Sequence, residues 1–335
     1  MLPTLRVLLL AIASAAAGPA AAEPAALPSL GAPEAVSEGH LGLEGPVAWP
    51  GESGRGAGVL FADVSAGKIL FYDRDSGQTR VVDPASGGAN GLALAGGELY
   101  RCEGKNRRVA ATELAAGEDG TPRLGATRPA AVAVPGGRPF FTNDLIAAGN
   151  GLFFTDPVYG PRPGGGPAVE GVYAIPLPAA SPPAEATLVV GDLVRPNGVA
   201  VDPAGVGLYV ADEGARKIHR YTVVPAAGGA APGLVGPSLF ADVAAFGNPD
   251  GMTTDRAGRL YVALFETGRL LVLSPDGEPL AIADAGERTS NVCLGHDQRH
   301  AYVTAGGTLL RFGLDVDRPA DEAPIRAGAR PPAGG

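Results

Sequence analysis

The chain has 335 residues, of which glycine (51) and proline (32) together make up about a quarter, while 45% of all residues are hydrophobic. That hydrophobic share argues against a disordered chain, and the abundance of the two poorest helix formers argues against a helical bundle. The formal net charge is −9 and no run is rich in Lys or Arg, which argues against nucleic acid or an anionic membrane surface as a partner.

The first 22 residues have the pattern of a secretory signal peptide. Arg6 supplies the positive charge, residues 7–17 form an apolar run too short to span a bilayer, and residues 20–22 (AAA) offer a small-residue cleavage site. We therefore expect export, a periplasmic or secreted mature protein, and no membrane insertion after cleavage. An uncleaved membrane anchor is the alternative.

Two segments flank the central part of the chain. Residues 23–38 are rich in Pro and Ala and are predicted to form a flexible linker, whereas residues 314–335 lack periodicity and are predicted to form a disordered tail. Cys102 and Cys293 are 191 residues apart and form neither a CxxC motif nor a zinc-type spacing. They are predicted to be small buried hydrophobic residues, and a disulfide between them stays open for an exported protein.

A repeated unit fills residues 39–313. Residues 197–221 (NGVAVDPAGVGLYVADEGARKIHRY) and 250–273 (DGMTTDRAGRLYVALFETGRLLVL) share a polar head residue, an alternating run, a turn, a second run and a third strand. Six copies begin 41 to 54 residues apart, which is the size of one propeller blade. The sequence thus predicts an all-β fold, a six-bladed β-propeller with a central channel. A β-sandwich with accidental similarity is the alternative. The head residues of the copies are Glu44, Asn90, Asn143, Asn197, Asp250 and Asn291.

All six head residues carry a carboxylate or a carboxamide. In a propeller, equivalent positions lie at one height around the axis, so we expect a ring of oxygen donors at one mouth of the channel. Two confined carboxylates repel each other, and a divalent cation removes that repulsion. Oxygen ligands favour calcium or magnesium over a thiolate-type zinc site. The alternative is that Asn-Gly and Asp-Gly are turn residues that need a positive φ.

Several short motifs resemble one known family over essentially the whole predicted propeller. They are Glu44-Gly45-Pro46, Cys102-Glu103-Gly104 followed by Arg107-Arg108-Val109, Asn143-Asp144, residues 155–160 (TDPVYG), Arg195-Pro196-Asn197-Gly198 and Pro249-Asp250-Gly251-Met252. With these motifs the chain resembles the senescence-marker-protein/gluconolactonase/luciferin-regenerating-enzyme-like family, in its gluconolactonase-type branch. The resemblance implies a six-bladed propeller with one divalent metal in the channel. We expect calcium, with magnesium, manganese or zinc as alternatives.

The resemblance also implies roles for single residues. It implies metal binding by Glu44, Asn197 and Asp250, metal or substrate contact by Asn143, and a general-base role for Asp250. The residues expected to contact substrate are Asn143, Asn90, Asn291, Glu103 and Tyr159. The chain departs from the family at one position: some members carry a substrate-binding arginine two residues before the asparagine of the ND motif, where this chain has Phe141, and Arg138 lies five residues before Asn143.

These expectations combine into a hypothesis of metal-dependent hydrolysis of a small lactone, a sugar aldono-lactone of the gluconolactonase type. The metal is expected to polarise the ester carbonyl, and Asp250 to take a proton from water. A serine-hydrolase mechanism is unsupported because no G-x-S-x-G motif occurs, and neither a P-loop nor a complete dinucleotide fingerprint is present. Two alternatives stay open: a non-catalytic exported propeller that binds a sugar or a protein partner, and hydrolysis of another ester at the same metal site.

Overall fold

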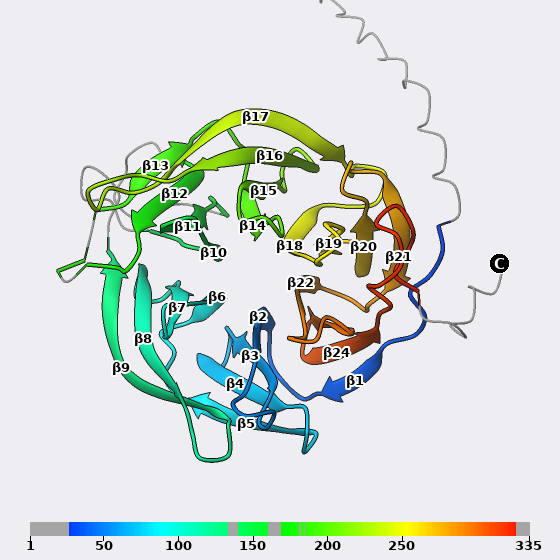
Figure 1. Cartoon of the computed structure of the whole chain (residues 1–335), viewed down its shortest axis with the longest axis horizontal. Coiled ribbons are helices and arrows are strands. Elements are labelled where there is room, and N and C mark those ends of the chain that lie inside the picture. The colour runs from blue at the N-terminus through cyan, green and yellow to red at the C-terminus, as the bar shows by residue number, and fades with distance from the viewer. Residues whose placement is uncertain (1–26, 133–139, 160–168, 181, 184, 326–335) are drawn as a thin grey trace, which may run out of the picture.

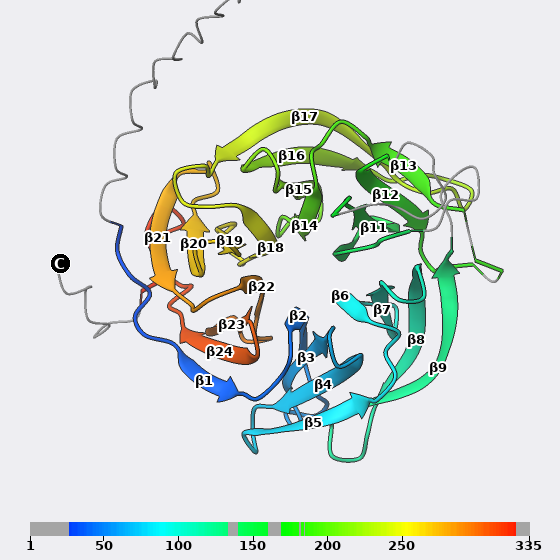
Figure 2. The ribbon, with the colours of Figure 1, turned by 180° about the vertical axis from the view of Figure 1, so that it is seen from behind.

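The computed structural model describes residues 27–132, 140–159, 169–180, 182–183 and 185–325, and within these ranges the chain forms strands without a helix. Six four-stranded antiparallel sheets stand around one axis (Figures 1 and 2). The predicted all-β, six-bladed β-propeller is therefore confirmed.

Five blades follow the chain without interruption, each from its innermost to its outermost strand. Blade 1 comprises β2 (Leu43–Trp49), β3 (Gly58–Asp63), β4 (Lys68–Asp73) and β5 (Gln78–Asp83), and blade 2 comprises β6 (Ala89–Ala95), β7 (Glu98–Glu103), β8 (Arg108–Ala116) and β9 (Pro122–Ala131). Blade 3 comprises β10 (Leu145–Ala148), β11 (Gly151–Asp156), β12 (Gly171–Pro176) and β13 (Thr187–Val190), and blade 4 comprises β14 (Pro196–Val201), β15 (Gly207–Asp212), β16 (Lys217–Val224) and β17 (Gly233–Asp242). Blade 5 comprises β18 (Pro249–Thr254), β19 (Leu260–Leu264), β20 (Arg269–Leu273) and β21 (Pro279–Asp284).

Blade 6 combines the two ends of the chain. Its inner strands are β22 (Thr289–Leu294), β23 (His300–Ala305) and β24 (Thr308–Gly313), and its outer strand is β1 (Glu34–Ser37), which pairs antiparallel with β24 (Figure 1). The linker expected over residues 23–38 is thus wrong for residues 34–37. They form a strand because β24 would otherwise be an unpaired sheet edge.

The tail expected over residues 314–335 is also wrong for its first part. Residues 314–325 pack on blades 5 and 6, where Leu314 and Val316 are buried. The fully buried Arg259 pairs with Asp255 (2.7 Å) and donates to the backbone carbonyls of Val316 (2.9 Å) and Glu322 (3.0 Å). A buried guanidinium needs several acceptors, and this segment supplies them as backbone carbonyls, which composition does not reveal.

Apolar faces of neighbouring blades pack against each other and form the core. The second strand of each blade lies between two such faces, so β3, β11 and β15 are buried at every residue, whereas the outer strand β17 is mostly exposed. Cys102 and Cys293 are buried, as predicted, and the disulfide that had stayed open does not form between them. The described part of the chain contains no helix with the length and hydropathy to cross a membrane. The predicted signal peptide (1–22) and Arg138 lie outside the described residues.

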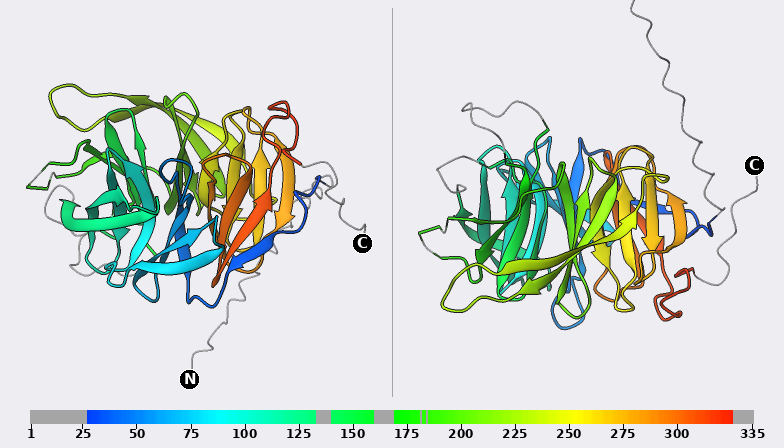
Figure 3. Two further views of the ribbon diagram at one scale, coloured as in Figure 1. Left: turned by 60° about the horizontal axis from the view of Figure 1, so that its bottom comes forward. Right: turned by 90° about the horizontal axis from the view of Figure 1, so that it is seen from above.

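Loops gather at the two flat faces of the ring, as the side views show (Figure 3). The six innermost strands begin at the same face, which carries the head residues, and we call it the site face. Strands within a blade are antiparallel, so the turns between second and third strands also lie on the site face. A cavity of about 350 Å³ lies among the innermost strands of all six blades and forms part of the predicted central channel; its lining includes Val47, Leu94, Leu145, Val199, Met252 and Val292.

Candidate active site and metal centre

Glycines after the head residues let the innermost strands approach closely. A Cβ atom at Gly198 would overlap the carbonyl oxygen of Asp250, and one at Gly251 would overlap the side chain of Asn291. Neither glycine has a positive φ. The turn alternative for the Asn-Gly and Asp-Gly pairs is therefore wrong at these two positions, where glycine permits contact between blades rather than a turn.

Irregular pairing sets the direction of most head side chains. The ladder between first and second strands shifts register next to the head position in five blades, and bulges of this kind re-aim side chains and increase local twist. The shifts lie between Glu44 and Val47, Ala89 and Leu92, Pro196 and Val199, Pro249 and Met252, and Thr289 and Asn291.

Four carboxylates meet at the head of the channel. Asp250 is buried, and its pKa lies well above the usual range because of burial and because of the negative charges of Glu44, Glu213 and Asp144. The pKa of Glu44 is raised to about 8 by burial and then by Asp144. Burial also raises the pKa of Asp144 to about 6. These groups therefore lie close enough to repel one another, and their surroundings disfavour their charged forms.

The amide of Asn197 has a fixed orientation. Its Nδ2 donates to the hydroxyl of Tyr159 (2.8 Å) and to Glu213 Oε2 (3.4 Å), and the Tyr159 hydroxyl donates to the same carboxylate oxygen (2.6 Å). The amide oxygen Oδ1 is buried and has no hydrogen-bond partner. Leaving a buried acceptor unsatisfied costs about 1–3 kcal/mol, so the Asn197 Oδ1 atom is a candidate ligand for a bound cation or substrate.

The donor set fits a hard divalent cation. Glu44 and Asp250 offer carboxylate oxygens that need a positive charge, and Asn197 offers an unpartnered amide oxygen. Asn143, which comes just before β10, is half-buried and holds its position through backbone bonds from its N–H to Thr155 (3.0 Å) and from Gly91 to its carbonyl (2.9 Å). No cluster of three or more His, Cys, Asp or Glu with metal-binding geometry occurs in the described ranges. A set of two carboxylates with amide oxygens suits calcium or magnesium.

Two further head residues, Asn90 and Asn291, differ in whether their side chains are free to contact a substrate. Asn90 and Glu44 line the same cavity of about 210 Å³ on the site face, and Asn90 Oδ1 is buried without a partner. Asn291 is committed within the protein, because its Oδ1 accepts from the Val292 N–H (2.8 Å) and its Nδ2 donates to Glu44 Oε2 (3.5 Å). Asn90 can thus contact a substrate, whereas Asn291 positions Glu44.

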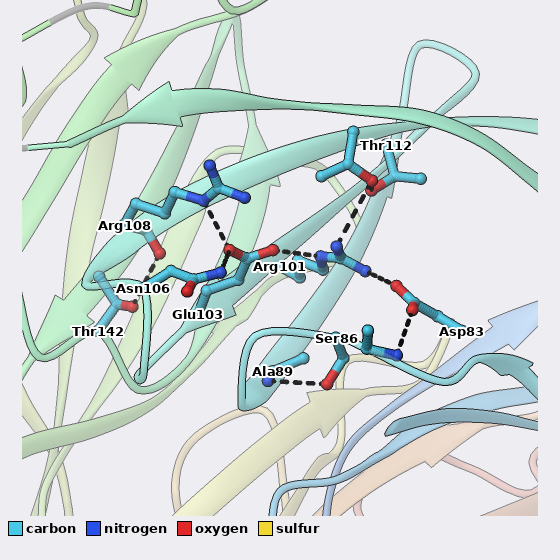
Figure 4. Close-up of polar contacts among 11 residues, drawn as sticks. Asp83, Ser86, Ala89, Arg101, Glu103, Asn106, Arg108, Thr112 and Thr142 are labelled. Atoms are coloured by element: carbon cyan, nitrogen blue, oxygen red, sulfur yellow. Dashed lines mark hydrogen bonds and ion pairs between the residues drawn. The ribbon is translucent and has the colours of Figure 1, made fainter. Parts of the chain in front are cut away.

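The structure does not bring Glu103 into the site, which corrects the substrate-binding role expected for it. Its carboxylate is fully buried and accepts from Arg101 Nε (2.7 Å), Asn106 Nδ2 (2.7 Å) and Arg108 Nε (2.6 Å) (Figure 4). Arg101 also pairs with Asp83 of blade 1. With both oxygens bound and no exposed surface, Glu103 joins blades 1 and 2 rather than touching a ligand.

Two acidic residues at the site, Asp144 and Glu213, had no predicted role. Asp144 accepts backbone N–H bonds from Leu145 (2.9 Å) and Val199 (3.2 Å) and lines the channel. The signal that could have found it was the acidic residue of the ND motif, at the place where four of the other five copies have glycine. Glu213 lies at the end of the second strand of blade 4, where Asp212 instead caps local turns through Val194 and Ala215. Sequence alone gave no means to choose between these adjacent acids.

Comparisons with known proteins agree with this propeller fold. The family model described as SMP-30/Gluconolactonase/LRE-like region matches residues 44–307. The chain therefore belongs to this family.

Named relatives match parts of the chain. It is 28% identical over 181 residues to a gluconolactonase of Zymomonas mobilis, covering 50% of this chain and 49% of that protein. It is 31% identical over 160 residues to a 6-deoxy-6-sulfogluconolactonase of Pseudomonas putida, covering 43% of this chain and 53% of that protein. The matches span about half the length of these curated relatives. The solved structure of a putative gluconolactonase superposes with a TM-score of 0.67 at 26% identity, covering 87% of this chain and 93% of that one.

Proposed function

We propose that this protein hydrolyses a small lactone, a sugar aldono-lactone of the gluconolactonase type, with the help of one divalent cation. The observation that carries the proposal is the buried Asp250, crowded by other carboxylates, beside the unpartnered Oδ1 of Asn197. Two curated relatives named as lactonases support this reaction class. We further propose that the protein acts in the periplasm or outside the cell, from the signal pattern of residues 1–22.

Glu44, Asn197 and Asp250 would hold the cation, and Asn143 would contact the cation or the substrate. Calcium is the proposed ion, with magnesium, manganese and zinc as alternatives. When bound, the cation supplies Lewis acidity that polarises the ester carbonyl and stabilises negative charge on its oxygen.

The chain's own residues supply the proton transfer and the orientation. Asp250 takes a proton from the attacking water, and burial raises the proton affinity that this role needs. As the ring C–O bond breaks, the same proton passes to the leaving oxygen, so that the products are a hydroxyl and a carboxyl group. Asn90 accepts a hydrogen bond from a sugar hydroxyl, while Tyr159 and Glu213 fix the amide of Asn197.

A pH-stat assay against a panel of lactones, with and without chelator, tests the proposal. We expect acid release on at least one aldono-lactone, loss of that release with chelator, and recovery when calcium is added back. A protein that binds calcium but turns over no lactone in the panel would instead be the non-catalytic propeller that binds a sugar or protein partner.

A further inference from the structure

Four arginines on the site face share a rare backbone conformation. In the described part of the chain, six non-glycine residues have a positive φ, and four of them are arginines. They are Arg107 (φ 54°), Arg195 (54°), Arg216 (56°) and Arg288 (60°). Each precedes the start of a first strand or lies in a turn between second and third strands, which places all four on the site face. The left-handed region is sparsely populated by arginine, and such residues cluster at functional sites.

Three of these arginines interact with neighbouring side chains. Arg216 pairs with Glu266 (2.9 Å), Arg195 lies 4.0 Å from Glu213, and the Arg107 guanidinium stacks over the ring of Phe141 (4.4 Å to the centroid). Arg288 differs. Its backbone carbonyl is fixed by the Gly306 N–H (3.1 Å), but its guanidinium forms no hydrogen bond or ion pair with any residue that the structure describes.

Arg288 lines a cavity on the site face that two of the head residues, Glu44 and Asn90, also line. The cavity of about 210 Å³ is bounded by Glu44, Asn90, Ser65, Ser290, Phe265 and Arg288, among others. A second cavity, of about 510 Å³, shares Phe265 and Arg288 with the first and extends along blade 5, where Glu266, Asp284 and Glu287 also line it. Arg288 therefore lies between the cavity lined by Glu44 and Asn90 and the second cavity, and the half-exposed ring of Phe265 (38%) provides an apolar wall beside it.

A guanidinium in this position selects for a particular chemistry. It has five N–H donors and no acceptor, carries a permanent charge, and matches carboxylate, sulfonate or phosphate oxygens in a planar, two-point arrangement. We propose that Arg288 binds an anionic substituent on the arm of the lactone, so that the preferred substrates are acidic sugar lactones rather than neutral ones. That the substrate is a lactone rests on the proposed function. The anion-binding role of Arg288 does not depend on it.

Calorimetric binding of ring-opened sugar acids to the calcium-loaded full chain tests the inference. Gluconate, which has a neutral arm, is the reference, and glucarate, 6-phosphogluconate and the 6-sulfonate of gluconate carry the three candidate anions. We expect at least one of these three to bind about 10- to 100-fold more tightly than gluconate, as expected for a charge-assisted hydrogen-bonded pair. Whichever ligand shows the preference identifies the anion.

Matched variants attribute the preference to one residue. Arg288→Asn removes the charge and keeps a residue that tolerates the left-handed backbone, and Arg216→Asn makes the same change at another left-handed arginine on the same face. We expect Arg288→Asn to abolish the preference and Arg216→Asn to keep it. Equal binding of all acids by the unaltered protein, a preference that survives Arg288→Asn, or one lost equally in Arg216→Asn would overturn the inference.

The binding readout separates this inference from the proposed function. An Arg288-dependent anion preference without hydrolysis of any lactone would support the anion site and reject the lactonase. Hydrolysis of neutral lactones by a protein without the preference would do the reverse.

Discussion

Asp250 and Glu103 are both buried acidic residues, yet their surroundings are opposite. Both oxygens of Glu103 accept hydrogen bonds, two of which come from arginines (Figure 4). Asp250 is buried among three other carboxylates, so that burial and then their negative charges raise its pKa, and the amide of Asn197 opposes this shift. The fold neutralises the buried Glu103 carboxylate with arginines, but no residue that the structure describes provides a paired positive charge for the buried Asp250. This contrast indicates that Asp250 binds a ligand.

The strongest test of the contrast is Asp250→Asn. This change keeps the shape of the side chain and removes a base and a charge. We expect lactone hydrolysis to fall by about 10³-fold, near 4 kcal/mol of transition-state stabilisation, with folding retained. Rates from the pH-stat assay and thermal unfolding would be measured together. Hydrolysis at the normal rate in this variant would remove Asp250 from the mechanism.

Glu103→Ala should have the opposite signature. The change leaves Arg101 and Arg108 without the carboxylate between them, and removing one partner of a buried ion pair costs about 3 kcal/mol or more. We expect a lower free energy of unfolding in denaturant titrations and an unchanged kcat for the folded fraction. A stable variant that has lost its activity would place Glu103 back in the substrate site.

Removing the cation should lower the stability of the folded protein, and adding it back should restore that stability. A ligand that binds only the folded protein adds about 2.7 kcal/mol at a concentration 100 times its Kd. We expect calcium to raise the Tm of the chelated protein, and to raise it far less in Glu44→Gln, which offers a weaker donor set. A calcium response that is the same in Glu44→Gln would show that the ion binds elsewhere.

Tyr159→Phe should give the smallest effect. The change removes the hydroxyl that links Asn197 to Glu213, and groups that orient metal ligands are worth about 10-fold or more in metal affinity. We expect calcium affinity to fall about 10-fold with little change in stability. The control is Tyr100→Phe, which removes a hydroxyl donating to Glu98 (2.6 Å) away from the site and should leave calcium affinity unchanged. Equal calcium affinities in the two variants would argue against a positioning role for Tyr159.

Much of the architecture could be predicted because each blade of a propeller carries the same sequence pattern of a polar head residue followed by strands and turns. The six head residues marked six blades, and the ring geometry followed from the repeat alone. Glu44, Asn197 and Asp250 were therefore expected near one another, and the charges that raise the pKa of Asp250 place Glu44 beside it. Family membership came from short motifs in the right order, and the match over residues 44–307 confirms it.

The remaining features depend on partners that are distant in sequence. Residues 34–37 and 314–325 look unstructured by composition, but an open edge at β24 and the buried Arg259 give them partners. Glu103 lies in one of the motifs that carry the family resemblance, yet its partner Arg101 also pairs with an acidic residue of another blade. Glu213 is adjacent to a similar residue that faces a turn, so only the strand geometry distinguishes them.

The central claim is that the head of the channel binds one divalent cation through Asp250 and its neighbours. Calorimetric titration of the chelated protein with calcium, in parallel with Asp250→Asn, tests it most directly. The account predicts one bound ion per chain in the unaltered protein and an affinity at least 100-fold weaker in the variant. Absence of divalent-ion binding by the unaltered protein, or equal binding by both, would contradict it.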